Sequence, residues 1–385
     1  MYLFAADTIR TAQAALESGR LAEARVLLET MPGDGRAQAV LAQVYFHLKM
    51  PQRAAAAALL AQRLAPGMPD VQHALALYFA QSGQRKLAAK WEGRFAQSKD
   101  ADGAAGARAA MLFGEVGQWP EAIAFGSAAI ERGDRSDLRL LLAHAFEATG
   151  KPDAALEQYR ALLDLLPYDE PSHAAYGQAL LRMARFNDAS TFLAEARRKF
   201  DKSPQIELAY GVALYTQRRF TEAAEQFFRV IDLAPDVPQP YIFLGRMIDQ
   251  LVDRVPELRA RAEVWLRMEP KNGFAPFVVA RAMRASGVPD TEIKTLLEEA
   301  IRRDPTAWEF PFEFGQLLER ERDLAGAAQA FEKSIALNPL APEPHYRLAR
   351  IYDRLGQPAK AARERQSHEK LLAPPTKHGI KGGMQ

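Results

Sequence analysis

The sequence predicts an all-α fold built as a stack of helix pairs, and three observations lead to it. A layout of two amphipathic segments, joined by a short polar turn and closed by a proline, recurs about every 34 residues along the 385-residue chain. A small residue returns at a fixed position on each of the two segments. Repeat arrays grow by adding such units, so we expect a solenoid instead of several globular domains.

The turn inside each helix pair is the easiest marker to follow. The clearest copy of the layout runs from Pro204 to Pro235 and turns at 217–220. Glycine suits such a turn because the chain leaving a helix often needs a positive φ. Where glycine is missing, we expect the same turn at a higher backbone cost. The marker falls at Gly19, Lys49, Gly83, Gly117, Gly150, Ala184, Arg218, Asp253, Gly287, Arg322 and Gly356.

Small residues on both helices of a pair predict close packing. On the first helix a small residue stands seven positions before the turn, as in Ala42, Gly211 and Gly315. On the second helix it stands four to five positions after the turn, as in Ala54 and Ala327. Two helices approach closely only where the facing side chains are small.

A proline closes the second helix of most units. Proline cannot continue a helix and pushes the residue before it out of the helical region, so it separates one unit from the next. These prolines are Pro66, Pro167, Pro235, Pro270, Pro305 and Pro339.

The fourth unit is the richest in glycine. Gly106, Gly114, Gly117 and Gly126 fall within it, and Gly103 directly precedes it. Glycine in a helix interior costs roughly 1 kcal/mol relative to alanine. Two interpretations stay open: a hinge, or close packing against bulky neighbours, which we favour.

Period, small residues and closing proline together resemble the tetratricopeptide repeat (TPR) family. Its pattern is matched by Leu244-Gly245, by Ala327 with Phe331, and by Pro339. The chain departs from the family in one respect, because no unit has the tryptophan that usually starts the first helix. The resemblance implies a right-handed superhelical solenoid of about eleven units over residues 3–372.

The expected units follow from the markers and this resemblance. They are 3–33, 35–66, 69–100, 104–134, 136–167, 171–202, 204–235, 238–270, 273–305, 308–339 and 342–372. Residues 373–385 begin with two prolines after Ala373, contain three glycines and show no periodicity. We expect them to form a disordered tail.

Composition narrows the class of protein. Lys plus Arg number 50 and Asp plus Glu 48, so the net charge of +2 argues against a nucleic-acid-binding solenoid. There is no cysteine, and no apolar run is long enough to span a bilayer. The N-terminus has no signal-peptide pattern, which predicts a cytoplasmic protein, or a periplasmic one if the true start lies upstream. The alanine and arginine usage suggests a bacterial source.

The sequence lacks the motifs of common enzymes. No HExxH, Walker A loop, dinucleotide-binding glycine motif or GxSxG elbow occurs. The seven histidines have no zinc-ligand spacing with a third donor. We therefore expect no catalytic residues, no metal, no cofactor and no small-molecule substrate.

The TPR resemblance implies that first helices line a concave groove, and it indicates which positions face inward. In the N-terminal half these positions hold mostly uncharged residues that indicate no particular ligand, for example Gln13, Gln43, His73 and Leu77. In the C-terminal half they form a stripe of arginines with an aromatic residue heading three units. The candidate peptide-binding residues are Arg246, Asp249, Phe277, Arg281, Arg284, Phe312, Gln316, Glu319, Arg320, Tyr346, Arg347, Arg350 and Arg354.

Two interpretations of this stripe stay open. Arginine makes bidentate bonds to carboxylates and stacks on aromatic rings, so the stripe would suit an acidic peptide with apolar anchors. Alternatively, the arginines pair with Asp249, Glu319 and Asp353 and only solvate a helix face. The lysine–asparagine set with which some TPR proteins grip a C-terminal carboxylate is missing.

The predicted function is a non-catalytic scaffold for protein–protein interaction that binds peptide segments or partner helices in the concave groove. One alternative is a subunit of an envelope, secretion or other multiprotein complex whose activity lies in its partner. Self-association of open stacks is a further alternative. A nucleic-acid-binding solenoid ranks below these because of the near-neutral charge. A basic last unit leaves RNA or anionic-lipid contact as a minor alternative to simple capping.

Overall fold

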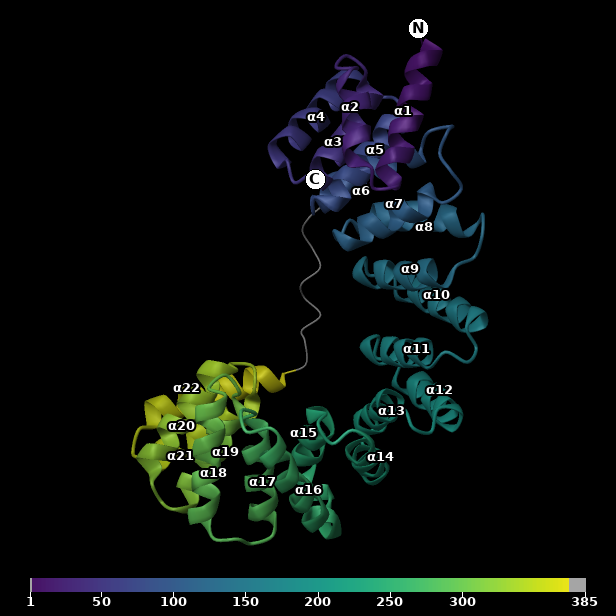
Figure 1. Cartoon of the computed structure of the whole chain (residues 1–385). Helices are drawn as coiled ribbons and strands as arrows, with labels where there is room; N and C mark the ends of the chain where they lie inside the picture. Colours follow the sequence, from purple (N-terminus) through teal and green to yellow (C-terminus); the bar gives the residue numbers. More distant parts are fainter. Residues whose placement is uncertain (1, 374–385) are drawn as a thin grey trace, which may run out of the picture. The chain divides into compact units, whose positions relative to one another are not determined.

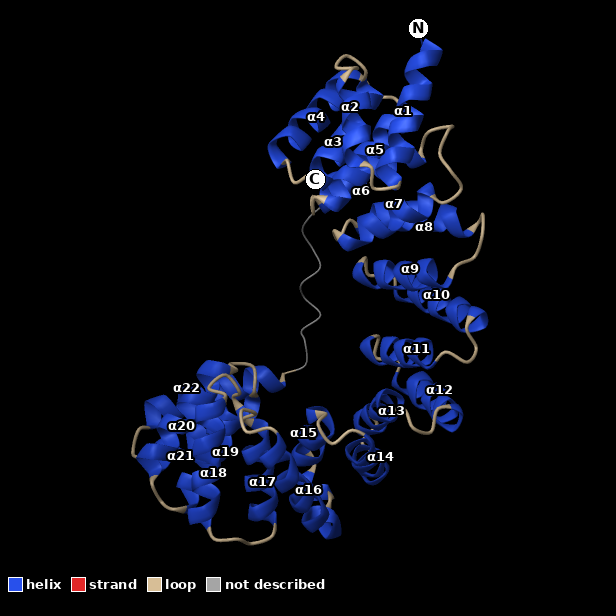
Figure 2. Cartoon of the chain, viewed as in Figure 1, coloured by secondary structure: helices blue, strands red, loops and turns tan. Residues whose placement is uncertain are grey.

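A computed structural model describes residues 2–373 of the chain, and within that range it contains helices and no strand (Figures 1 and 2). This confirms the all-α prediction. The residues group into two compact units, Met1–Met183 and Ala184–Gln385. The expected C-terminal tail lies outside the described residues except for Ala373.

In the first unit, each helix packs on the next, and three of the first helices (α1, α3 and α7) also contact the first helix of the following pair. Such contact between neighbours only is typical of repeat arrays. The helices are α1 Tyr2–Glu17, α2 Leu21–Glu29, α3 Gly35–His47, α4 Pro51–Leu64, α5 Pro69–Gln81, α6 Arg85–Ala96, α7 Ala105–Glu115, α8 Trp119–Ile130, α9 Ser136–Ala148, α10 Pro152–Leu165 and α11 Glu170–Arg182.

The second unit repeats this arrangement with one irregularity, two short 3₁₀ helices after α15. One buried apolar core runs through it from Leu214 to Ala361. The elements are α12 Phe186–Lys199, α13 Pro204–Thr216, α14 Phe220–Leu233, α15 Pro238–Arg246, η1 Ile248–Gln250, η2 Val252–Arg254, α16 Val255–Met268, α17 Phe274–Ala285, α18 Asp290–Arg303, α19 Glu309–Arg320, α20 Leu324–Leu337, α21 Pro342–Arg354 and α22 Pro358–Leu372.

The turn marker is confirmed at ten of its eleven positions, which have a positive φ. Six of them are glycines, and Lys49, Ala184, Arg218 and Arg322 adopt φ values between 56° and 66°. The prediction is wrong at Asp253, which lies in η2. There the buried side chains of Ile248 and Leu251 hold the chain in tight 3₁₀ turns, so no left-handed residue is needed.

The closing prolines end the second helices as predicted. In each of the six cases the helix stops two residues before the proline, for example at Leu233 before Pro235. The residue between them leaves the helical region, as Ala234 does with φ −147° and ψ 79°. The repeats are therefore separated by the backbone restriction that each proline imposes on the residue before it.

The small residues allow the close approach that their positions predict. A Cβ added at Gly315 would lie 2.7 Å from Cε1 of the fully buried Phe331, and one at Gly211 would lie 2.7 Å from Cε1 of Phe227. In the fourth repeat, a Cβ at Gly126 would lie 3.0 Å from Leu142 Cδ2. This crowding supports close packing there as the reason for glycine.

Candidate functional site

The residues predicted to bind a partner lie in the second unit, on α15, η1, α17, α19 and α21. The structure brings most of them together, because ion pairs join these elements across successive repeats. The resulting C-terminal stripe is a contiguous face, but its arginines are largely engaged with carboxylates of the same unit.

Arg281 and Arg284 on α17 both reach the carboxylate of Glu313 on α19. Arg281 Nε lies 3.5 Å from Glu313 Oε1, and Arg284 Nη1 donates to Oε2. The Glu313 side chain is only 5% exposed. Burial lowers the pKa of the Arg281 guanidinium, and Glu313 opposes that shift. These two arginines therefore compensate a buried negative charge, and a charge reversal at either would disrupt the fold.

Four of the other arginines of the stripe are also paired. Arg347 and Arg354 donate to the two oxygens of Glu319, at 3.3 and 3.4 Å. Arg246 Nη2 donates to Glu309 at 2.9 Å, and Arg320 Nη2 donates to Asp290 at 2.9 Å. The pairing with Glu319 is the one that the solvated-face interpretation predicts.

The aromatic residues of the stripe differ in exposure. Phe277 is only 3% exposed and packs against Phe310, with ring centroids 4.9 Å apart. Phe277 is thus a core residue, and its expected role as an accessible anchor is wrong. The ring of Phe312 is half-buried and packs on the buried Phe331 at 5.8 Å. Tyr346 is 47% exposed.

One exposed part of the stripe has no carboxylate partner among the described residues. The Arg350 guanidinium lies 5.7 Å from the centre of the Tyr346 ring, and both side chains are exposed. Asp249 is exposed and Gln316 is half-buried. The Tyr346–Arg350 pair is therefore what remains of the stripe as a free recognition surface.

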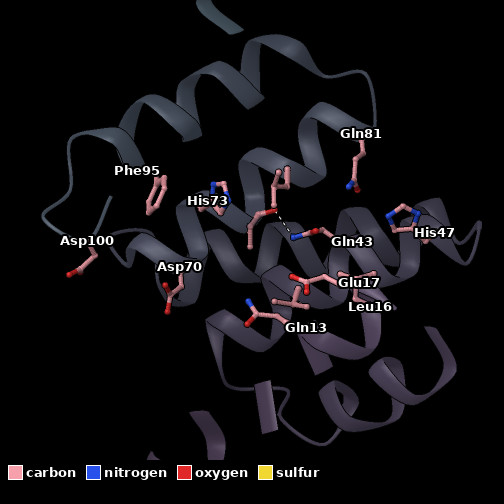
Figure 3. A pocket seen from close by; sticks show the side chains of 13 residues that line it. Gln13, Leu16, Glu17, Gln43, His47, Asp70, His73, Gln81, Phe95 and Asp100 are labelled. Atoms are coloured by element: carbon pink, nitrogen blue, oxygen red, sulfur yellow. Dashed lines mark hydrogen bonds between the residues drawn. The ribbon is translucent and has the colours of Figure 1, made fainter. Parts of the chain in front are cut away.

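The first unit contains a hollow of about 560 Å³ on the inner face of its first three helix pairs (Figure 3). Figure 3 shows His73 and Phe95 toward one end, His47 at the other and Gln43 between them. We call this hollow the N-terminal groove. Residues of α1, α3 and α5 line most of it: Gln13, Leu16, Glu17, Val40, Gln43, His47, Asp70, His73, Ala74, Leu77 and Gln81, with Phe95 and Asp100 beyond them.

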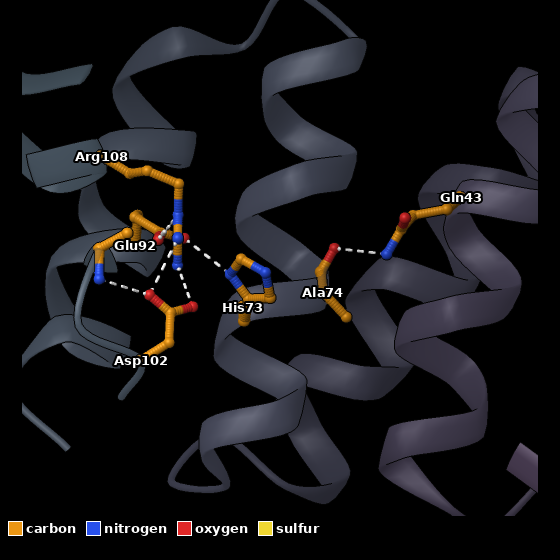
Figure 4. A network of polar contacts seen from close by, with 7 residues as sticks. Gln43, His73, Ala74, Glu92, Asp102 and Arg108 are labelled. Carbon is orange, nitrogen blue, oxygen red and sulfur yellow. Dashed lines mark hydrogen bonds and ion pairs between the residues drawn. The ribbon is translucent and has the colours of Figure 1, made fainter. Parts of the chain in front are cut away.

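A polar network fixes one wall of the N-terminal groove (Figure 4). Glu92 on α6 is 2% exposed and accepts hydrogen bonds from Arg108 Nε at 2.7 Å and from His73 Nδ1 at 3.0 Å. Arg108 also donates to both oxygens of Asp102, at 3.0 and 2.8 Å. Hydrogen bonding to Arg108 lowers the pKa of the Asp102 carboxyl. The network holds His73 in one orientation.

A second interaction fixes the floor. Gln43 on α3 is only 6% exposed, and its Nε2 donates to the backbone oxygen of Ala74 on α5 at 3.0 Å. This bond ties the first helices of two repeats together. It also fixes the side-chain amide, whose Oε1 has no hydrogen bond from any described residue. A rigid first-helix face with fixed polar atoms can bind a ligand without reorganising.

The sequence pattern predicted an inward-facing position for Gln13, Gln43, His73 and Leu77 but indicated no binding role for them. It missed Glu92, Glu309 and Glu313, whose partners come from other helices. A usable signal existed, because Glu313 stands inside the apolar run Phe312-Glu313-Phe314 and a buried charge needs a partner.

These faces carry arginine, aromatic and amide side chains, which are residue types common at binding surfaces. Among residues 2–373 no group of three or more histidine, aspartate or glutamate side chains is placed to hold a metal ion. Within the same range, no helix has the length and apolar character needed to cross a membrane. What the described residues present is a stack of helix hairpins with inner faces suited to binding, the class of helical-repeat interaction proteins.

Comparison with protein families gives the particular family. Two models of the tetratricopeptide repeat match the chain, one over residues 107–170, 175–238 and 294–342, the other over residues 330–363. These segments cover about half of the 385 residues. The chain belongs to the tetratricopeptide repeat family and is a protein-interaction scaffold of that kind. No curated protein matches it.

Solved structures are similar at low sequence identity. The structure of Naa15/Naa10 bound to HypK-THB matches with a TM-score of 0.53 and 14% identity, over 97% of this chain and 69% of that one. The Cut9–Hcn1 hetero-tetramer of the APC/C matches with 0.48 and 11%, over 95% and 87%. Yeast Tom70 matches with 0.47 and 13%, over 96% and 92%. The first of these similarities supports the shared fold.

Proposed function

We propose that this chain is a non-catalytic scaffold that binds a segment of a partner protein in the N-terminal groove. The observation that carries the proposal is the 560 Å³ hollow built by the first helices of three successive repeats. Its volume lies in the range of ordinary ligand sites, roughly 300–1,000 Å³. Its walls are held by Glu92 and Gln43, so the binding surface is formed before a partner arrives.

A site-specific crosslinking experiment tests this proposal. The photoreactive residue p-benzoylphenylalanine replaces Leu77, which lines the groove and is 39% exposed. The matched control carries it at Val26, a 57% exposed position on the second helix α2. We expect a protein to be crosslinked at position 77 and not at position 26. That protein, once purified, should bind the wild type and not Leu77→Arg, whose longer side chain fills the groove. Equal crosslinking at both positions would contradict the proposal.

A second candidate site rests on the exposed Tyr346–Arg350 pair of the C-terminal stripe. Arginine beside an accessible aromatic ring suits an acidic segment with one apolar residue. Tyr346→Ala with Arg350→Glu tests this site without touching the buried Glu313 cluster. If the crosslinked partner binds this variant as tightly as the wild type, the C-terminal stripe has no part in binding it.

A further inference from the structure

We propose that the N-terminal groove is specific for a lysine or arginine side chain on an extended segment of the partner. This inference rests on the proposed function and names the chemistry that the groove selects. It is opposite in sign to the acidic ligand expected for the C-terminal stripe.

The fixed polar atoms of the groove are hydrogen-bond acceptors. Because Nε2 of Gln43 is committed to Ala74, the atom left for a ligand is Oε1, on a side chain only 6% exposed. His73 Nδ1 faces the Glu92 carboxylate at 3.0 Å. A carboxylate only accepts, so Nδ1 donates to Glu92, and whenever the imidazole carries a single proton its Nε2 is left as an acceptor. Two acceptors held in place by buried partners call for a donor in the ligand.

The charge of the lining points the same way. Glu17, Asp70 and Asp100 line the groove, are exposed, and have no ion pair with any described residue. No lysine or arginine is among the lining residues. A single-sign cleft of this kind attracts the opposite charge.

Neighbouring cations do not neutralise this cleft. Arg10 and Arg36 line a smaller adjoining hollow, which shares Asp70 with the groove. Arg10 lies 3.8 Å from Asp7, and Arg36 donates to Asp34 at 2.9 Å. Asp70 also stands in the first turn of α5, where a carboxylate stabilises a helix, but its carboxylate accepts no hydrogen bond from any described residue.

Apolar walls accompany the acceptors. Leu16, Val40, Leu77 and Phe95 line the same groove. Lysine and arginine carry a charged head on an alkyl stem, and such side chains lay the stem along apolar surface while the head meets acceptors. An inorganic cation or a small polyol would leave these walls uncovered. The combination of hydrogen-bond acceptors, carboxylates and apolar walls therefore favours a basic side chain of a peptide.

Selection from a random library tests the specificity with the full chain. A displayed library of random 12-residue peptides is selected on the wild type and on Glu17→Gln/Asp70→Asn/Asp100→Asn. The matched control is Glu121→Gln/Glu157→Gln/Asp164→Asn, three exposed carboxylates on the second helices α8 and α10. Circular dichroism confirms equal helicity. The most enriched peptide is then synthesised with each lysine and arginine replaced in turn by norleucine.

We expect lysine and arginine to be enriched in peptides selected by the wild type and the control, and not in those selected by the groove variant. Replacing the recognised residue by norleucine should weaken binding at least tenfold, because the alkyl side chain removes the charge-assisted hydrogen bonds and leaves the acceptors of the groove unpaired. Enriched peptides without a basic preference would overturn this inference and leave the proposed function standing. No enrichment over bare resin would overturn both.

Discussion

Replacing Glu92 by glutamine tests how the wall of the N-terminal groove is held. The carboxylate is 2% exposed and accepts from two donors, Arg108 Nε at 2.7 Å and His73 Nδ1 at 3.0 Å. A glutamine has one acceptor oxygen, so only one of these bonds can survive as it is. We expect Oε1 to keep Arg108, because a guanidinium cannot change into an acceptor.

The other half of the new amide then meets His73. The amide nitrogen introduced by Glu92→Gln would donate to Nδ1 of His73, which forces the imidazole proton onto Nε2, the ring nitrogen left for a ligand. The substitution should therefore convert an acceptor of the groove into a donor and weaken binding of a basic peptide. Replacing a charged acceptor by a neutral one lowers the local free energy of unfolding by about 1 kcal/mol per hydrogen bond, or roughly 1–2 kcal/mol for the two bonds. Arg108 limits the loss because it keeps both bonds to Asp102.

Two measurements check these expectations. Hydrogen exchange of the amides in α5–α7 reports the local stability, which suits a repeat array better than a single unfolding midpoint. Long-range ¹H–¹⁵N NMR spectra of the histidine rings report the tautomer, with His73 assigned by its loss in His73→Gln. Glu121→Gln, an exposed carboxylate, serves as the control. Unchanged exchange together with an unchanged His73 tautomer would refute the account of the network.

Three further predictions concern the backbone and the pH response. Gly315→Ala should destabilise α19–α20 by about 1–2 kcal/mol in urea unfolding, because crowding against the buried Phe331 outweighs a helix-propensity gain of roughly 1 kcal/mol; a stabilised variant would contradict this. Arg322→Gly, at φ 66°, should stabilise by about 0.5–1 kcal/mol in the same assay, and a loss would argue against left-handed strain. Because the folded state lowers the pKa of Asp102, the stability that its ionised carboxylate contributes is present above the ordinary pKa of 3.8 and is lost as the pH falls through the folded pKa. Acid should therefore lower the urea midpoint of the wild type more than that of Asp102→Asn. Parallel pH profiles of the two proteins would exclude the ion pair with Arg108 as a source of stability.

The sequence predicted the features that are set by local backbone chemistry. Turn positions such as Gly287 and Arg322 could be read from their spacing, because each repeat needs one left-handed residue between its helices. The same reasoning failed at Asp253, where burial of Ile248 and Leu251 decides the local structure instead. Spacing carries information about the backbone and little about burial between repeats.

The candidate site depended on contacts that spacing does not encode. The stripe was predicted from arginines on single helices, such as Arg284 and Arg347. Their partners Glu313 and Glu319 come from the next or previous repeat, and only the structure shows that these pairs already exist. In the N-terminal groove, the orientations of the Gln43 amide and the His73 ring are set by hydrogen bonds to the backbone oxygen of Ala74 and to Glu92.

The internal pairing of the C-terminal stripe has a thermodynamic consequence. An acidic segment that bound Arg246, Arg347 or Arg354 would have to displace Glu309 or Glu319, so binding there would be an exchange in which the number of ion pairs stays the same. Affinity of that kind changes little with ionic strength. A cation in the N-terminal groove would instead create ion pairs where none exist, and its affinity should fall as salt screens them. Added salt could thus release one ligand from this chain while the other stays bound.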